Sequence, residues 1–234
     1  MSLRQLNDNL AASTHSVFKK FFVERGVGDT YISGSFSTLI AAEIGGDWGN
    51  DTLLGNQNTE IRCIRGTDIP DLNRGTVSNA PVRFVLAKNA KEKRLKASDL
   101  VIEISGGSPT QSTGRIAFVH PECLAKQTVP LLCSNFCRVL RIKQEYALYA
   151  YCYWQYLYRN GRLFCYENSS TGLKNLDLSG FINEEPVPMP PIDVIRRFNS
   201  EIELLRCEMI RNQSEIDNLL TTKTLILPQL LTHC

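Results

Sequence analysis

Residues 191–233 carry a hydrophobic repeat that strongly constrains how this chain can fold. Apolar side chains recur at alternating steps of three and four residues, and nine of the eleven positions in the repeat are apolar. This 3.5-residue spacing is typical of a coiled coil, because it keeps one stripe of a helix facing a partner helix. The predicted helix-pairing residues are Ile195, Phe198, Ile202, Leu205, Met209, Asn212, Ile216, Leu219, Ile226 and Leu230, with Lys223 at the remaining position.

The predicted helix is long and begins abruptly. About 40 residues at ~1.5 Å each make a rod of about 60 Å, which is longer than the core of a compact domain requires. Four prolines between residues 186 and 191 predict an extended linker before it, and Asp193 suits the first turn. Asn212 and Lys223 are polar residues of the kind that fix register and partner number in coiled coils. A long core helix of a globular domain is the alternative interpretation.

A second amphipathic helix is predicted at residues 2–24, where glycines end it. Between the two helices, short alternating apolar runs predict strands at 61–69, 82–87, 99–105, 115–120 and within 129–142, and an aromatic helix at 144–162. The strands at 99–105 and 115–120 are expected to pair. Because no βαβ rhythm is visible, we predict an α+β fold with an N-terminal helix (1–25), one mixed α/β domain (26–185) and a long coiled-coil-forming helical region (186–234).

The composition excludes several classes of protein. The chain is 43% hydrophobic and 21% charged, which is typical of a globular protein. No apolar run reaches the ~20 residues of a membrane span, and the polar N-terminus lacks the features of a signal peptide. We therefore expect a cytoplasmic protein without a membrane partner. The eight cysteines lie mostly within apolar runs and are predicted to be reduced thiols.

Catalytic and metal-binding patterns are weak. His120, Cys123, Cys133 and Cys137 have the residue types of zinc ligands, but their spacing matches no zinc knuckle, so no metal site is predicted. The chain contains no GxxxxGK[ST] phosphate loop and no GxGxxG turn after a strand. Its three histidines offer few candidates for a general base. The sequence therefore favours a binding protein over an enzyme.

The charge is unevenly distributed along the chain, although the net charge is only +2. Residues 83–96 contain six basic residues and one acidic residue, and residues 138–174 contain six and two. Residues 180–234 contain five basic and eight acidic residues. A basic domain on an acidic rod favours contact of the domain with a polyanion and of the rod with protein. A solvated charged surface explains the charge alone equally well.

Two polar segments, predicted to be loops at residues 105–115 and 168–175, concentrate side chains that can read base edges in DNA. Arg and Lys can bond guanine, and Asn and Gln can bond adenine, although polar segments are more often solvated turns. The aromatic residues of 144–162 recur at helical spacing and are predicted to be core. The candidate base-contacting residues are Ser108, Thr110, Gln111, Ser112, Thr113, Arg115, Ser169, Ser170, Thr171, Lys174 and Asn175, and the candidate phosphate-contacting residues are Arg62, Arg65, Arg74, Lys88, Lys91, Lys93 and Arg94.

Four segments, taken in order, resemble the specificity (S) subunit of type I restriction–modification enzymes. LNDNLAASTHSVFKKFFV (6–23) is similar to the end of the family's central conserved helix, and LKASDLVIEISGGSPTQSTGRIAFV (95–119) to a segment that forms a glycine-rich hairpin. NSSTGLKNLDLSGFINEEPVPMPPIDVIRRFNSEI (168–202) resembles the stretch in which a recognition domain closes and a conserved helix starts. LLTTKTLILPQLLT (219–232) resembles the end of that helix. Residues 193–196 depart from the pattern, because the family usually has an acidic–Gln pair there.

The resemblance implies a non-catalytic subunit whose target recognition domain reads one half of a split DNA sequence. The implied partners are double-stranded DNA, the methyltransferase (M) subunits, which bring S-adenosylmethionine, and the restriction (R) subunit, which uses ATP and Mg²⁺. No cofactor is expected in this chain itself. With one recognition domain, the chain resembles a C-terminal half or a half-subunit that forms a dimer. The helical rod is then expected to pair antiparallel with the equivalent helix of the other half.

Two other functions remain open at the level of the sequence. A coiled-coil assembly adaptor, whose globular domain binds protein rather than DNA, would not retain DNA even at low salt. A free-standing methyltransferase would bind S-adenosylmethionine as an isolated chain.

Overall fold

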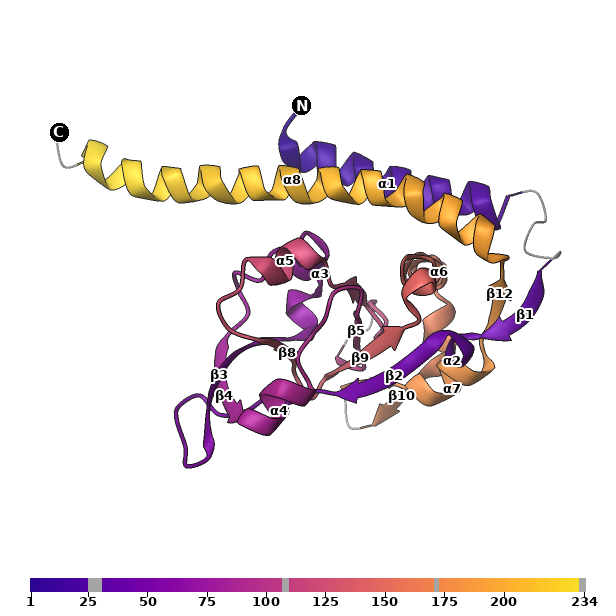
Figure 1. Cartoon of the computed structure of the whole chain (residues 1–234), viewed down its shortest axis with the longest axis horizontal. Helices are drawn as coiled ribbons and strands as arrows, with labels where there is room; N and C mark the ends of the chain where they lie inside the picture. The colour runs from indigo at the N-terminus through magenta and orange to yellow at the C-terminus, as the bar shows by residue number, and fades with distance from the viewer. Residues whose placement is uncertain (25–30, 107–109, 171–172, 232–234) are drawn as a thin grey trace.

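Two long helices from opposite ends of the chain lie side by side along one side of a mixed α/β domain (Figure 1). The computed structural model describes residues 1–24, 31–106, 110–170 and 173–231, without the side chains of 169–170 and 228–231. Helix α1 spans Leu3–Phe22, and α8 spans Ile192–Leu231, a length of 40 residues. Both helices were predicted from the sequence, and their observed ends lie within two residues of the predicted ones. Among the described residues, no helix is both long and apolar enough to cross a membrane.

The strands of the described residues form four small sheets. Most neighbours are antiparallel, while β3 and β8 run parallel, so the α+β prediction is confirmed. The expected pairing of residues 99–105 with 115–120 is confirmed by β5 and β7. The first sheet has the order β2 (Ile40–Gly45), β9 (Cys137–Ile142), β5 (Leu100–Glu103) and β7 (Ile116–Phe118), and the second has the order β4 (Val82–Leu86), β3 (Gln57–Ile64) and β8 (Leu131–Cys133). The third sheet has the order β10 (Glu167–Ser170), β11 (Leu173–Leu176) and β6 (Ser105–Gly106), and the fourth consists of β1 (Ile32–Ser35) and β12 (Pro186–Met189).

Helix α6 (Ala147–Arg159) is the aromatic helix predicted from the sequence. Its Tyr149 and Trp154 are fully buried, which confirms that these aromatic residues are core. Gly161 follows the helix with a φ of 73°, a left-handed conformation that glycine adopts without strain. The shorter helices and 3₁₀ turns are α2 (Phe36–Leu39), η2 (Gly66–Asp68), α3 (Ile69–Asn73), α4 (Ala87–Glu92), α5 (Pro121–Ala125), η3 (Gln144–Tyr146), η4 (Arg162–Tyr166) and α7 (Leu178–Glu184).

Two segments that were expected to be irregular are strands. Residues 168–175 were predicted as a polar loop, but most of them belong to the antiparallel strands β10 and β11. Residues 186–189 were predicted as part of a linker, but as β12 they pair with β1, with Met189 opposite Ile32. Proline is tolerated there because β1 is the one strand that pairs with β12 among the described residues, so a missing N–H can face away from the ladder.

Helices α1 and α8 are joined by a cluster of aromatic side chains. Phe18 on α1 and Phe198 on α8 are both fully buried, with ring centroids 6.1 Å apart. The Phe22 ring lies 4.9 Å from both Phe198 and Tyr149 of α6, in edge-to-face geometry. Aromatic pairs of this geometry contribute ~0.5–1.5 kcal/mol beyond the burial of their area. The same cluster therefore holds the two helices together and fixes them on the domain.

A buried polar pair sets how far α1 is displaced along α8. The Asn212 side-chain amide donates a 2.9 Å hydrogen bond to the Asn7 side-chain oxygen, and Asn7 donates a 3.0 Å bond to the Met209 carbonyl. Residues near the start of α1 therefore lie beside the middle of α8, and the helices run antiparallel. Because an unpaired buried amide is costly, other alignments of the two helices are disfavoured. Asn212 fixes the helix register as predicted, although it does so within one chain.

The prediction that the whole rod pairs with an equivalent helix of another half is wrong for the first part of α8. From Ile195 to Ile216, the heptad seam, which is the stripe of predicted helix-pairing residues, is covered by α1 and the domain of the same chain. The physical reason is that α1 presents a matching apolar stripe, which includes Phe18 and Phe22. Further along, Leu219 and Ile226 are 58% and 46% exposed, and Lys223 is exposed as well. The side chain of Leu230 lies outside the described residues.

Helix α8 also buries residues outside the heptad seam, because it contacts the domain as well as α1. Arg206 and Ile210 are 5% and 6% exposed. Gly75 has a φ of +79°, and a Cβ atom there would lie 3.1 Å from Ile210 Cδ1. The loop after α3 therefore approaches α8 closely only because it has no side chain at this position.

The aromatic cluster predicts that one substitution on α8 destabilises the entire fold. Replacing Phe198 with Ala should lower the free energy of unfolding by ~3–5 kcal/mol, because it removes a fully buried ring. Replacing Leu204, which is 74% exposed on the same helix, should change it by less than about 0.5 kcal/mol. Urea unfolding followed by circular dichroism measures both. Equal effects of the two substitutions would contradict the observed packing.

Candidate nucleic-acid interface

The two polar segments identified in the sequence come together as one small sheet. Strand β11 pairs with β10 on one side and with β6 on the other. Lys174 lies opposite Gly106, and Asn175 lies opposite Ser105. Ser105 and Gly106 of the first segment therefore lie beside Asn175 and Lys174 of the second, a contact between distant stretches that sequence periodicity gave no means of predicting. In Figure 1, the hairpin of β10 and β11 lies on the side of the domain away from α1 and α8.

Exposed apolar side chains surround this small sheet. Phe136, Phe164 and Leu173 are 57%, 45% and 51% exposed. The Lys174 ammonium lies 5.1 Å from the centre of the Phe164 ring and forms a 3.0 Å ion pair with Glu167. Exposed aromatic rings beside a cation suit stacking on bases. Sequence reasoning missed both phenylalanines, although an aromatic residue in the short turn between β8 and β9 was the available signal.

Several predicted base-contacting residues of the first segment form contacts inside the domain instead of facing solvent. Ser112 and Thr113 are buried, and the Thr113 hydroxyl lies 3.0 Å from the Glu167 carboxylate. Arg115 donates two hydrogen bonds, of 2.8 and 2.7 Å, to the buried carboxylate of Glu103. This ion pair raises the pKa of the Arg115 guanidinium above its usual value.

Of the other predicted base-contacting residues, some lie at or near the surface, and some lie outside the residues that the structure describes. Thr110 and Gln111 are exposed. Asn175 is half-buried. Ser108 and Thr171 lie outside the described residues, as do the side chains of Ser169 and Ser170.

Helix α4 and the turn after it expose part of the basic run of residues 83–96 to solvent. Lys88, Lys91 and Arg94 are exposed, and α4 follows directly after β4. Lys93, in contrast, donates a 2.9 Å hydrogen bond to the Gly46 carbonyl and is half-buried. The exposed cations suit contact with phosphates, which needs charge within reach rather than a fixed geometry. In Figure 1, α4 lies on the same side of the domain as the β10–β11 hairpin.

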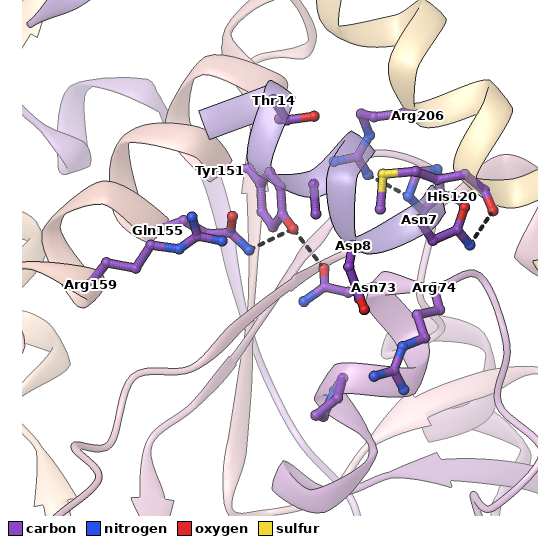
Figure 2. Close-up of a pocket in the computed structure, with 13 residues that line it drawn as sticks. Asn7, Asp8, Thr14, Asn73, Arg74, His120, Tyr151, Gln155, Arg159 and Arg206 are labelled. Atoms are coloured by element: carbon purple, nitrogen blue, oxygen red, sulfur yellow. Dashed lines mark hydrogen bonds between the residues drawn. The ribbon is translucent and has the colours of Figure 1, made fainter. Parts of the chain in front are cut away.

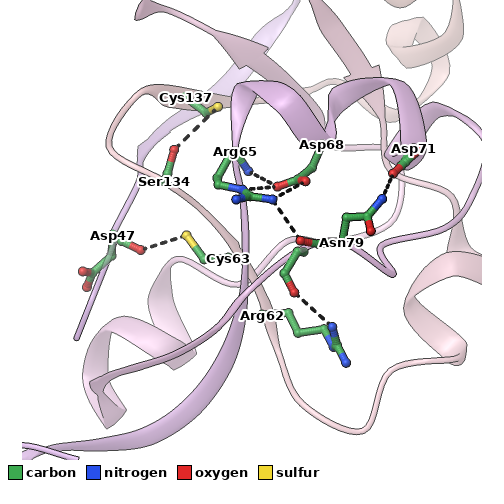
Figure 3. A network of polar contacts seen from close by, with 10 residues as sticks. Asp47, Arg62, Cys63, Arg65, Asp68, Asp71, Asn79, Ser134 and Cys137 are labelled. Atoms are coloured by element: carbon green, nitrogen blue, oxygen red, sulfur yellow. Dashed lines mark hydrogen bonds and ion pairs between the residues drawn. The ribbon is translucent and has the colours of Figure 1, made fainter. Parts of the chain in front are cut away.

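The three remaining predicted phosphate-contacting arginines take part in internal contacts, two of them in the network of Figure 3. Arg65 forms a bidentate ion pair with the buried carboxylate of Asp68 and also bonds the Asn79 carbonyl at 2.9 Å. Arg62 donates a 3.0 Å bond to the Ala80 carbonyl. Arg74 forms a 3.2 Å ion pair with Asp71 and remains 54% exposed. These contacts fix the segment from β3 to β4.

The loop between β2 and β3 is a surface feature that sequence reasoning missed. At its base, the buried Arg83 guanidinium lies 4.0 Å from the Trp48 ring and forms an ion pair with Asp51. At its tip, Leu53 and Leu54 are 64% and 65% exposed. Figure 1 shows this loop projecting from the domain close to α4. A rigid base with an exposed tip is typical of a binding loop rather than a simple connection.

The candidate zinc ligands do not form a metal site. Within the described part of the chain, no group of three or more His, Cys, Asp or Glu side chains could hold a metal ion. His120 contacts Arg206 instead, and Ser134 lies beside the Cys137 thiol (Figure 3). Burial raises the pKa of the Cys137 thiol to about 12, so it remains protonated. A protonated thiol is a poor zinc ligand.

Comparison with known proteins identifies the fold. Neither models of protein families nor curated protein sequences match this chain. Among solved structures, the S subunit of the type I restriction–modification system from M. genitalium matches with a TM-score of 0.60 at 15% identity, over 96% of this chain and 55% of that one. The HsdS subunit from Thermoanaerobacter tengcongensis matches with a TM-score of 0.51 at 12% identity, over 91% and 47%.

A third match comes from a structure that describes the assembly and conformational transition of the type I R-M system. Its TM-score is 0.56 at 12% identity, over 94% of this chain and 50% of that one. The chain therefore has the fold of a type I restriction–modification S subunit, and it spans about half the length of the chains it matches. The resemblance seen in the sequence is confirmed at the level of the fold.

The ion pair between Arg115 and Glu103 predicts a structural role that can be separated from DNA contact. Replacing Arg115 with Ala should lower the free energy of unfolding by ~3–5 kcal/mol, because it leaves the buried Glu103 carboxylate unpaired. Replacing the exposed Arg94 with Ala should change stability by less than about 0.5 kcal/mol. Urea unfolding compares the two variants. An Arg115 variant as stable as the Arg94 variant would rule out the structural role.

The burial of the thiols predicts which cysteines react in the folded protein. At pH 8, a maleimide should label Cys165 and Cys207, which are exposed, with Cys207 slower because its pKa is raised. Five buried cysteines should react only after unfolding in denaturant, namely Cys63, Cys123, Cys133, Cys137 and Cys152. Peptide mass spectrometry identifies the labelled sites. Rapid labelling of Cys133 in the native protein would contradict the described core.

Proposed function

We propose that this chain is a non-catalytic DNA recognition subunit of a type I restriction–modification system, which reads one half of a bipartite target. The observation that carries the proposal is the match to S subunits over 91–96% of the chain. The match to the M. genitalium S subunit covers 96% of the chain, so it extends over the domain and most of the helical pair.

The surface of the domain supports this proposal. On the side away from α1 and α8, the small sheet offers Lys174 and Asn175 beside exposed aromatic rings, and α4 with the turn after it offers three exposed cations. Amide and ammonium groups can bond base edges, whereas the α4 cations suit the phosphate backbone. We assign base reading to the sheet and the adjoining segment of residues 110–111. Phosphate contacts are assigned to Lys88, Lys91 and Arg94.

The helices would connect this domain to the rest of the enzyme. Beyond Ile216, α8 extends past the start of α1 (Figure 1), and its exposed apolar residues there are Leu219, Leu220, Leu225, Ile226 and Leu227. Exposed apolar residues in such number mark an interaction surface. We assign it to the helix of a second recognition half, supplied by a second copy or by another S chain. The methyltransferase and restriction subunits, which carry S-adenosylmethionine, ATP and Mg²⁺, would dock on the helical side.

Phosphate binding by α4 predicts a specific change in the salt dependence of DNA binding. Replacing Lys88, Lys91 and Arg94 together with Gln should weaken binding of any duplex, because fewer DNA phosphates are neutralised. The slope of log K against log salt should become shallower by about 0.9 for each phosphate that the variant leaves unneutralised. Fluorescence anisotropy with a labelled duplex, in the presence of methyltransferase subunits, measures the slope.

A matched control tests whether the effect is local to α4. Arg4, Lys20 and Arg211 are exposed on the helices, and their joint replacement with Gln should leave the slope nearly unchanged, both with methyltransferase subunits bound, as checked by gel filtration, and for the chain alone. If the wild-type assembly does not retain DNA even at low salt, the domain binds protein instead, and the adaptor function is the better one.

Base reading by the small sheet predicts a changed target sequence. Replacing Lys174 with Gln or Asn175 with Ala should alter or relax one half of the methylated motif, because a missing base contact costs ~1–3 kcal/mol of discrimination. Methylome sequencing of a host that carries the variant locus gives the motif. Asn183, exposed on α7, provides a control whose replacement with Ala should leave the motif intact. An unchanged motif in both sheet variants would refute this assignment.

A further inference from the structure

A cavity of about 210 Å³ lies where α1 and α8 meet the domain (Figure 2). Its walls come from α1, α3, α6 and α8, so it is bounded by the helical pair and by the domain together. It lies on the helical side of the molecule, and the predicted DNA-contacting residues contribute only Arg74 to its lining. Nothing in the proposed reading of DNA requires it.

Arg206 of α8 contributes a buried positive charge to this cavity. The residue is 5% exposed, and its guanidinium lies 4.2 Å from the Phe118 ring centre and 4.9 Å from that of Tyr151. Among the described residues, no carboxylate lies within ion-pair distance of it, and its Nε has no hydrogen-bond partner. A buried charge without an opposite charge is costly, and proteins normally pair it.

The imidazole of His120 and the hydroxyl of Tyr151 are the polar neighbours of Arg206, and neither supplies the missing negative charge. Arg206 Nη2 contacts His120 Nε2 directly, as the dashed line in Figure 2 marks. Burial, together with the adjacent guanidinium, lowers the pKa of His120 to about 2. The ring is therefore neutral at physiological pH, and it can only accept a hydrogen bond from Arg206.

The remaining lining of the cavity increases the excess of positive charge. Arg74 and Arg159 join Arg206 around the same space, while Asp8 is the one carboxylate among the residues that line it. Asp71 forms an ion pair with Arg74, which leaves Arg159 and Arg206 to face the cavity. The amide of Gln155 donates a 2.7 Å hydrogen bond to the Tyr151 hydroxyl and borders the same space.

We propose that this cavity binds a small anion that carries a phosphate group. Guanidinium groups match the oxygens of phosphate with paired N–H donors, and two of them can clamp one phosphate from different helices. The volume exceeds several times the ~30 Å³ that one water occupies in the liquid, so a phosphate with a small substituent fits. Bound phosphate supplies the charge that Arg206 lacks.

Occupancy of the cavity would couple the helical pair to the domain. A ligand held by Arg206 of α8 and Arg159 of α6 contacts both parts at once. It therefore stabilises one orientation of the domain on the helices, since a ligand that binds only the folded arrangement stabilises it. The phosphate could belong to a free metabolite-sized ester or to a DNA backbone, and the two sources are separated by experiment.

Titration of the full chain with inorganic phosphate tests the proposal. Isothermal titration calorimetry at constant ionic strength, with chloride replaced stoichiometrically, should show one saturable site, and the melting temperature should rise with phosphate. Replacing Arg206 with Gln should weaken binding at least about 10-fold, while Arg206→Lys retains part of it, because the charge remains without the paired donors. Arg159 is exposed, so Arg159→Gln keeps the fold and should also weaken binding.

Arg211→Gln provides the control, because Arg211 lies on the same helix, is exposed and does not line the cavity. The absence of saturable binding in the wild type, or equal losses in the Arg211 and Arg159 variants, would overturn the proposal. Competition arms with adenosine monophosphate and with a short duplex identify the source of the phosphate, and displacement by either one supports the site. Because the readout is phosphate binding by the isolated chain, its failure leaves the proposed DNA reading untouched.

Discussion

The antiparallel contact between α1 and α8 is the interaction on which the rest of the structure depends. It joins residues from the two ends of the chain, through the rings of Phe18, Phe22 and Phe198 and the buried amides of Asn7 and Asn212. The aromatic rings supply most of the stabilisation of this helix contact, since they are large and buried away from water. The amides add alignment, because a shift along the helix would leave two buried polar groups unpaired. Helix α6 lies against the same rings, so the domain is positioned relative to the helical pair by one continuous core.

The polar interior of the domain serves positioning more than binding. Three buried carboxylates, of Asp68, Glu103 and Asp99, each receive a bidentate arginine. These pairs have a fixed geometry, and Glu103 lies beside Gly106 of the small sheet, so its pair with Arg115 helps to hold that sheet in place. The groups left for a partner are then those on the outer side, where cations and aromatic rings are exposed. A rigid support beneath exposed side chains suits recognition of a fixed partner such as a DNA groove.

Arg206 is different from these arginines, because it is buried without a carboxylate among the described residues. Its contacts with Phe118 and Tyr151 offset part of the cost of burial, since the faces of aromatic rings attract cations. The residue lies where the helical pair meets the domain, which is where a change of orientation would be transmitted. A charge that needs an external counter-ion at this position links the geometry of the molecule to the presence of a ligand.

The sequence by itself determined the long helices, the α+β class and half of the strands among the described residues, because hydrophobic periodicity is a local property that follows from which side chains face a core. It also indicated the aromatic helix, and it named Asn212 and Lys223 as register-fixing residues, of which Asn212 pairs with Asn7 while Lys223 is exposed. Only the tertiary structure decided which basic residues remain free for a partner: Arg115 and Arg94 look alike in the sequence, but one meets Glu103 and the other meets solvent. The joining of the two polar segments in one sheet and the pairing of α8 with α1 were likewise settled by contacts between distant parts of the chain. Such contacts depend on how the whole chain closes on itself, and no local pattern of residues encodes them.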